Sequence, residues 1–389
     1  MISDTSKQIK VSAPGKVILF GEHAVVLGKT SIATGLSLRT NCTIQLIDEP
    51  AFIVSLPDLG LNHELKWTKQ ELSSLANYKN IESVDSFKPC ECNNHFLEEL
   101  ATIHSMKGIQ SALFLYCVLS KLKHGVHIHF KSDLPIGAGL GSSGSFNVCL
   151  VAGLLRVFDL YACGGCEQCK GTHTCNDTHY TPCAKQLDLI NQWSLQGEKI
   201  MHGTPSGIDN AVSTYGRAIS FTRKDGIKPL DRIPPLRLLI TDTRVSRSTK
   251  ILVEGVVNRH QTYNNLMEPV AVLIDNISKE CLAAFDKYFI DSDVEQLQQA
   301  IELMIDMNHA LLSGCFGVGH KTLDLIATVS KQFGLHSKLT GAGGGGCAIT
   351  LLKPTTEQTV VDQLKDELRK HGFESWEATI GQPGLLFEK

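Results

Sequence analysis

The chain has 389 residues, of which 42% are apolar and 20% are charged, so it is long and apolar enough for two folded domains. Its formal net charge of −3 gives no electrostatic reason to expect a nucleic acid or a membrane surface as a partner. The apolar runs are shorter than the roughly 20 residues that span a bilayer, and the polar start has no apolar segment typical of a secretion signal. The 13 cysteines, several inside apolar runs, favour a reduced, cytoplasmic protein.

The first half of the chain mixes strand and helix patterns. The elements expected there are a strand, turn and strand over 9–20, strands at 31–47 and 126–130, helices at 96–123, 143–158 and 185–202, and a short helix near Asp209. Residues 51–90 show no clear pattern. The elements expected in the second half are strands at 236–240, 347–352 and 375–380, and helices at 248–289, 294–313, 321–333 and 356–370.

Strands and helices do not alternate strictly along the chain, which predicts an α+β fold rather than a doubly wound sheet. Prolines gather near residue 230, at Pro229, Pro234 and Pro235. We therefore expect one domain over residues 1–230 and a second over 231–389.

A glycine-rich segment, Pro135–Ser143, is the first candidate for phosphate binding. It is not a Walker A loop; Gly28–Thr30 resembles the end of one, but the required first glycine would fall at His23. The dinucleotide pattern G-x-G-x-x-G occurs at both Gly139–Gly144 and Gly341–Gly346, so it discriminates poorly here. The first of these also sits mid-chain, several residues after its strand.

A third interpretation is a glycine loop that leads into a helix with two hydroxyls. Glycines let backbone N–H groups approach phosphate closely, and the positive end of the helix dipole faces the anion. Ser142 or Ser143 could cap the helix, and a serine hydroxyl at this point can ligate Mg²⁺. An ordinary capped helix after a flexible turn has the same local pattern. Other segments of the chain must therefore decide whether this loop binds phosphate.

Three separated segments together resemble the three motifs of the GHMP kinase family. They are Ser12–His23, Pro135–Ser143 and Lys338–Cys347, in the order that the family has. The resemblance implies two α+β domains, an S5-like N-terminal domain and a ferredoxin-like C-terminal domain, with the active site between them. In that family the final strand tends to return to the first domain. Within the family, Gly21–Val26 and Gly197–Val212 are most similar to members that phosphorylate mevalonate.

The resemblance implies transfer of the γ-phosphoryl group of ATP to the 5-hydroxyl of mevalonate, in isoprenoid and sterol precursor synthesis. It also implies a homodimer and feedback inhibition by prenyl diphosphates. Another GHMP kinase, acting on galactose, homoserine or phosphomevalonate, is one alternative, and a catalytically silent ligand sensor on the same fold is another. A sensor could lose Lys16, Ser143, Glu198 or Asp209, yet all four are present.

By resemblance, Asp209 is the base that accepts the proton of the substrate hydroxyl, and Lys16 stands beside it and the transferring phosphoryl group. Taken alone, an acid in the first turn of a helix is commonly explained by the helix dipole. Ser143 and Glu198 are expected to hold Mg²⁺ between the β- and γ-phosphates. Glu198 lies beside the apolar stripe of its helix, where a buried acid without a partner would be costly.

The remaining expected contacts divide into a substrate side and a nucleotide side. On the substrate side the family resemblance indicates Glu22, His23, Arg247 and Thr249 together with Asp209, although His23 could instead be a structural histidine. On the nucleotide side it indicates Lys16, Asp58, Ser132, Gly137, Ala138, Gly139, Leu140, Gly141, Ser142 and Ser143. Asp58 replaces the amide of close relatives. The second glycine loop is expected to brace the first rather than to bind a second nucleotide.

A cysteine- and histidine-rich insert at 161–183 stands apart from these motifs. It holds Cys163, Cys166, Cys169, His173, Cys175, His179 and Cys183. A structural Zn²⁺ needs four such ligands, but the usual second C-x-x-C pair is missing. We prefer an exposed loop whose thiols have no special role, and keep structural Zn²⁺ as the alternative.

Overall fold

The computed structural model describes residues 8–75, 78, 83–135, 137–160, 173–174 and 179–388. In this part of the chain a large sheet carries the first domain, with strand order β4-β3-β5-β2-β1-β14-β7-β6 and with β8 pairing with β2 and β9. Its strands are β1 Gln8–Phe20, β2 Ser31–Ile47, β3 Ala51–Leu56, β4 Leu61–Thr68, β5 Gly125–Ser132, β6 His173–Thr174, β7 His179–Thr181, β8 Ala218–Thr222, β9 Gly226–Leu230 and β14 Leu386–Glu388.

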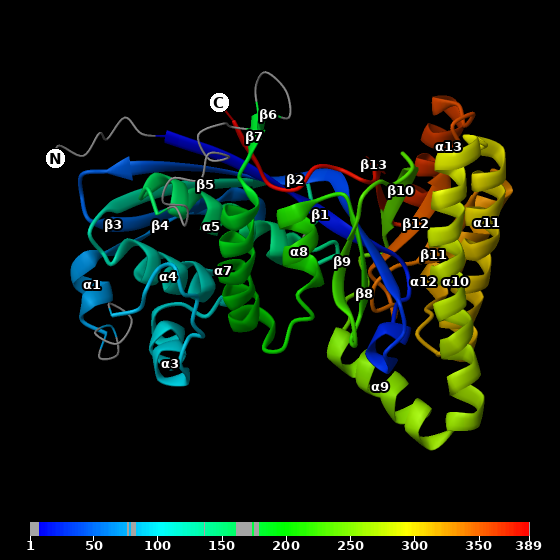
Figure 1. Cartoon of the computed structure of the whole chain (residues 1–389), viewed down its shortest axis with the longest axis horizontal. Helices are drawn as coiled ribbons and strands as arrows, with labels where there is room; N and C mark the ends of the chain where they lie inside the picture. Colours follow the sequence, from blue (N-terminus) through cyan, green and yellow to red (C-terminus); the bar gives the residue numbers. More distant parts are fainter. Residues whose placement is uncertain are drawn as a thin grey trace.

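Helices cover one face of this sheet (Figure 1). They are α1 Lys69–Ser73, α3 Asn94–Ile103, α4 Lys107–Ser120, α5 Ser142–Val157, α7 Ala184–His202 and α8 Ile208–Tyr215. Helix α4 is buried along its whole length from Ile109 to Ser120, and α5 is nearly so, because both lie between the sheet and other helices. This packing fixes the N-terminus of α5, where the first glycine loop ends.

A four-stranded sheet of order β11-β12-β10-β13 carries the second domain. Its elements are β10 Arg237–Asp242, α9 Thr249–Thr262, α10 Asn264–Asp291, α11 Val294–Ala310, the π-helical turn Leu311–Cys315, α12 Lys321–Gln332, β11 His336–Leu339, β12 Cys347–Leu352, α13 Gln358–Lys370 and β13 Glu374–Thr379. Figure 1 shows the long helices α10 and α11 side by side on the outer side of this domain.

The two sheets share a hydrophobic core. Val17 and Leu19 of β1 belong to the same buried cluster as Leu238 and Ile240 of β10. The chain passes from the first sheet to the second between β9 and β10, and it returns when β14 pairs with β1, Phe387 opposite Val11. The α+β class with two domains is therefore confirmed.

Several predicted elements have different limits in the structure. Residues 9–20 form one strand with an irregularity between Pro14 and Lys16, not two strands around a turn. The helix expected over 96–123 is interrupted after Ile103, where His104 is extended, and the helix expected over 248–289 is interrupted at Tyr263. The hairpins β3–β4 and β8–β9 and the short strand β11 were not predicted. Among the described residues, no helix combines the length and the apolar character needed to cross a membrane.

Candidate active site

A lysine–carboxylate pair marks the centre of the site. Lys16 lies at the irregularity of β1, and Asp209 lies in the first turn of α8, after Gly207 in the left-handed conformation. Lys16 Nζ is 3.0 Å from Asp209 Oδ1; the lysine side chain is 8% exposed and the aspartate side chain 32%. The pair is thus enclosed on the lysine side and open on the aspartate side, as a base that must reach a substrate requires.

The first glycine loop is held against this pair by close backbone contacts. The backbone N–H of Lys16 donates to the carbonyl of Leu140 at 2.8 Å. A Cβ on Gly141 would lie 2.9 Å from Lys16 Cγ, and one on Gly144 would lie 2.9 Å from the carbonyl carbon of Asp209. Small residues at these two positions therefore let the loop and α5 approach the reactive pair.

The N-terminus of α5 is capped differently from the expectation. Gly141, with φ 73°, is the N-cap residue, and no side-chain hydrogen bond caps the helix. The prediction that Ser142 or Ser143 caps it is wrong, because the glycine's left-handed backbone already makes the turn and leaves both serines inside the helix. The hydroxyl of Ser143 is directed to Glu198 instead, at 3.2 Å.

Glu198 on α7 is a buried carboxylate with neutral hydrogen-bond donors. Its side chain is 2% exposed, Ser143 donates to Oε2, and Asn147 Nδ2 donates to Oε1 at 2.8 Å. Burial, and then the negative charge of Asp209, raise the pKa of Glu198 to about 7. A cation beside this carboxylate would favour its ionised form and so oppose this rise in pKa. The oxygen donors of Glu198 and Ser143 are of the kind that Mg²⁺ prefers, so these two residues fit the metal expected from the sequence.

Four of the ten expected nucleotide contacts border one pocket next to the α5 N-terminus, whereas Lys16 and residues 137–141 do not line it. Its polar lining includes Asp58, Ser132, Ser142 and Ser143, and its walls are largely apolar. Asp58, in the short turn Pro57–Leu59, accepts a 2.7 Å hydrogen bond from the backbone N–H of Ser132 through Oδ2. An apolar pocket with polar groups at its end suits a nucleobase joined to phosphates.

Arg247 lies between the two glycine loops. Its guanidinium donates to the carbonyl of Ala138 at 2.9 Å. A Cβ on Gly139 would come within 2.3 Å of this guanidinium, and one on Gly346 within 1.6 Å. Thr249 is exposed at the start of α9, and the described contacts do not join it to this group.

Glu22 and His23 lie at the junction of the two domains, where they contact the third motif. The Glu22 carboxylate pairs with Lys338 of β11, and both side chains are fully buried. His23 is buried, and its Nε2 lies 2.7 Å from the carbonyl oxygen of Ala342. Burial lowers the pKa of His23, which favours the neutral ring.

Comparison with known proteins adds the family. Residues 109–163 match the GHMP kinase N-terminal domain, and residues 282–372 match the GHMP kinase C-terminal domain. The chain is 55% identical to mevalonate kinase of Dictyostelium discoideum, covering 99% of this chain and 98% of that protein. It is 40% identical to mevalonate kinase of Homo sapiens, covering 98% and 95%. The chain belongs to the mevalonate kinase family of GHMP kinases.

Solved structures of GHMP kinases share the fold. L. major mevalonate kinase in complex with R-mevalonate superposes with a TM-score of 0.71 at 21% identity, covering 98% of this chain and 99% of that one. Lactococcus lactis galactokinase complexed with galactose superposes with a TM-score of 0.65 at 17% identity, covering 99% and 96%. At these identities the likeness concerns the fold alone, and it extends beyond mevalonate kinases to sugar kinases of the family.

Three side chains of the site escaped prediction. Asn147 holds Glu198, Lys338 pairs with Glu22, and His202 Nε2 lies 3.1 Å from Ser143 Oγ. His202 follows Glu198 by four residues on α7, and residues at this spacing lie on the same face of a helix. The sequence could therefore have indicated His202. Lys338, between Ser337 and Leu339 at the start of the third motif, carries a weaker sequence signal. Nothing in the local sequence marks Asn147.

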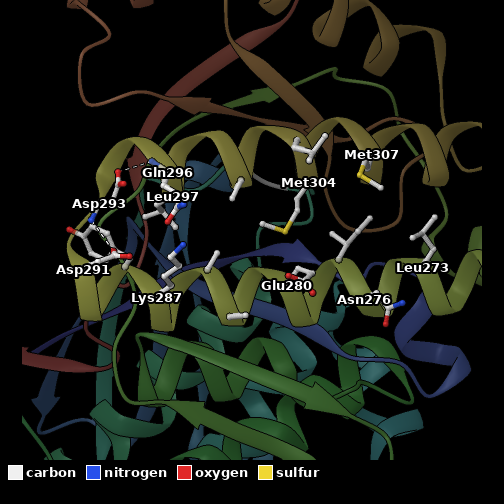
Figure 2. A pocket seen from close by; sticks show the side chains of 16 residues that line it. Leu273, Asn276, Glu280, Lys287, Asp291, Asp293, Gln296, Leu297, Met304 and Met307 are labelled. Carbon is white, nitrogen blue, oxygen red and sulfur yellow. Dashed lines mark hydrogen bonds between the residues drawn. The ribbon is translucent and has the colours of Figure 1, made fainter.

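Two further regions lie apart from the candidate active site. Figure 2 shows an apolar groove between α10 and α11, with Leu273, Met304 and Met307 along it. None of the predicted site residues lines this groove.

In the insert, Cys163, Cys166, Cys169 and Cys175 lie outside the described residues. Cys183 is the buried residue before α7, and within the described ranges no group of three or more His, Cys, Asp or Glu side chains could hold a metal ion.

Proposed function

We propose that this chain transfers the γ-phosphoryl group of ATP to the 5-hydroxyl of mevalonate, giving 5-phosphomevalonate and ADP. The observation that carries the proposal is the 3.0 Å contact of Lys16 and Asp209 beside the glycine loop, in a chain related over its whole length to mevalonate kinases. A catalytically silent sensor would have no need to keep this pair together with Ser143 and Glu198.

In the proposed reaction Asp209 accepts the proton of the substrate hydroxyl as the hydroxyl oxygen attacks the γ-phosphorus. Lys16 pairs with Asp209 and stabilises the negative charge of the transferring group. The loop from Gly137 to Gly141 and the free N–H groups at the start of α5 hold the phosphates. The elements that carry the two reactive groups, β1 and α8, pack against each other and against α5, so the groups are fixed before substrate arrives.

Ser143 and Glu198 are the proposed ligands of Mg²⁺. When bound, Mg²⁺ would offset the charge of the β- and γ-phosphates. Asn147 holds one carboxylate oxygen of Glu198 and thereby leaves the other, Oε2, directed toward Ser143. The protein's part is to orient these two oxygens.

The substrate and nucleotide sides follow from the same arrangement. Arg247, which lies against Ala138 at the cradle, would attract an anionic group, either the mevalonate carboxylate or a phosphate. Glu22 and His23 are proposed on the alcohol side. Asp58 and Ser132 are proposed as nucleotide contacts. Thr249 is proposed as a substrate contact on the family resemblance alone.

The proposal also includes the domain limits, the assembly, the regulation and the location of the protein. We propose a first domain of residues 1–230 and a second of 231–389 whose last strand, β14, joins the first sheet. A homodimer and feedback inhibition by prenyl diphosphates are proposed by analogy with the family, and a cytoplasmic location is proposed from the cysteine content. The apolar groove between α10 and α11, with Leu303 62% exposed beside it, is a candidate surface for the dimer.

A coupled assay of ADP release tests the reaction. Mevalonate, galactose, homoserine and phosphomevalonate would each be offered with MgATP at equal concentration. We expect mevalonate to give the highest kcat/KM. The absence of mevalonate-dependent ADP release, or faster turnover of another alcohol, would refute the proposed substrate.

A further inference from the structure

A buried ion pair joins the first motif to the third across the domain junction. Glu22 follows β1, and Lys338 lies on β11 of the second sheet; Lys338 Nζ donates to Glu22 Oε1. Burial raises the pKa of Glu22 and lowers the pKa of Lys338, while the charge of each partner opposes the effect on the other. Desolvation offsets much of the attraction in such a pair, so stability alone is a weak explanation for it.

The two residues of the first motif each leave one polar atom open. Glu22 Oε2 and His23 Nδ1 are buried, and neither has a hydrogen-bond partner among the described residues. Their other polar atoms are held by the third motif, Oε1 by Lys338 and Nε2 by the carbonyl oxygen of Ala342. Buried polar atoms without partners are costly and uncommon. We therefore expect these two atoms to contact a ligand.

The chemistry of the two open atoms restricts what that ligand presents. Because His23 Nε2 faces a carbonyl oxygen, Nε2 carries the proton, and Nδ1 of the neutral ring is an acceptor. Glu22 Oε2 is an acceptor as well. A ligand group here must donate hydrogen bonds, which a hydroxyl does and a carboxylate does not. Glu22 and His23 follow shortly after β1, the strand that also carries the reactive lysine, Lys16.

We propose that Lys338 is a positioning residue for the alcohol substrate. Its ammonium group holds Glu22 Oε1 and thereby fixes the orientation of Oε2, and Oε2 and His23 Nδ1 accept hydrogen bonds from substrate hydroxyl groups. Lys338 itself contacts neither the alcohol nor the nucleotide. This inference rests on the phosphotransferase function proposed above, and it directs the carboxylate of the substrate away from these two residues.

Thr340 offers a matched control at the same junction. Its hydroxyl donates to the carbonyl of Ile18 at 2.9 Å, so it also joins the third motif to β1, and it is buried. Thr340→Val removes a contact between the domains without altering the charge at Glu22. A role that is only structural would make Lys338→Met and Thr340→Val behave alike.

The test measures KM for the alcohol, KM for ATP and Tm in both variants. For Lys338→Met we expect KM for the alcohol to rise at least about tenfold, as for loss of a hydrogen bond to a charged group, with KM for ATP nearly unchanged. Lys338→Arg keeps the charge and should recover part of the loss. Thr340→Val should lower Tm and leave both KM values near those of the wild type. An unchanged KM for the alcohol in Lys338→Met, or an equal rise in Thr340→Val, would overturn the inference.

A double variant covers the case in which Lys338→Met does not fold. Glu22→Gln with Lys338→Met removes both buried charges and should restore Tm toward the wild-type value. KM for the alcohol should stay raised; a wild-type KM would show that the pair is only structural. If wild-type enzyme prefers an alcohol other than mevalonate, the proposed substrate fails, but the same comparison is made with that alcohol. An enzyme that phosphorylates none of the alcohols would overturn both proposals.

Discussion

Two lysine–carboxylate pairs in this protein have the same chemistry and different surroundings. Lys16 and Asp209 bridge β1 and α8 within the first domain, and the aspartate is 32% exposed. Lys338 and Glu22 bridge the two domains, and both side chains are fully buried. A carboxylate that takes a proton from a substrate must be reachable, whereas the buried pair is proposed to orient one carboxylate oxygen and to transfer no proton. Access therefore separates the reacting pair from the positioning pair.

The largest effect is expected at the exposed carboxylate. Asp209→Asn keeps the shape but removes the base, so kcat should fall about 10²- to 10⁴-fold with little change in ATP affinity. Steady-state kinetics and a nucleotide-binding titration would measure both. Asp188→Asn is the control, because Asp188 pairs with the hydroxyl of Tyr215 rather than with a lysine. A normal kcat in Asp209→Asn would show that Asp209 is not the base, and would contradict the separation of a reacting pair from a positioning pair.

Lys16→Met is expected to have the second-largest effect on kcat. Loss of a preorganised charge at the transferring group typically reduces kcat about 10²- to 10³-fold. The comparison predicts that this variant loses kcat, whereas Lys338→Met mainly raises KM for the alcohol. Both variants would be assayed at saturating ATP over a range of alcohol concentrations. The same kinetic pattern in both would contradict the division of roles.

Glu198 predicts a pH dependence of the Mg²⁺ requirement. Its pKa is raised to about 7, so without metal the carboxyl group is mostly protonated below pH 7 and ionised above it. Since Mg²⁺ binds the ionised form, the Mg²⁺ concentration for half-maximal rate should rise, by up to about tenfold per pH unit, as pH falls below 7. Magnesium titrations at several pH values would show this rise.

Glu198→Gln separates this effect from the protonation of ATP. The variant should need more Mg²⁺ at every pH, and it should keep only the pH dependence that ATP itself causes. If wild type and variant show the same dependence on pH, Glu198 is not the titrating ligand.

The smallest effect is expected at the edge of the nucleotide pocket. Asp58 is exposed and holds the backbone N–H of Ser132. Asp58→Ala should raise KM for ATP about two- to tenfold, as expected for one hydrogen bond, and leave KM for the alcohol unchanged. A change in KM for the alcohol alone would show that Asp58 lies on the substrate side of the site and not on the nucleotide side.

The reacting pair could be predicted from sequence because its residues lie in recognisable motifs. The helix limits near 143–158 and 185–202 also agree closely with α5 and α7, since periodicity and a bordering glycine loop mark them. The interruptions at His104 and Tyr263 were missed because neither site carries a glycine or a proline that would signal a break.

The positioning pair shows what sequence reasoning could not supply. Glu22 and Lys338 are 316 positions apart, so no local pattern links them. Glu22 was predicted as a substrate contact, and its burial against Lys338 appears only once β11 is placed beside the end of β1. β11 itself has four residues, too few for a clear strand pattern.

Phosphorus NMR of the reaction product tests the central claim most directly. With mevalonate and MgATP, we predict a new phosphomonoester signal split into a triplet by the two hydrogens on C5, formed in step with ADP. Asp209→Asn should produce this signal far more slowly. Inorganic phosphate as the only product, or a phosphomonoester without that splitting, would contradict transfer to the 5-hydroxyl.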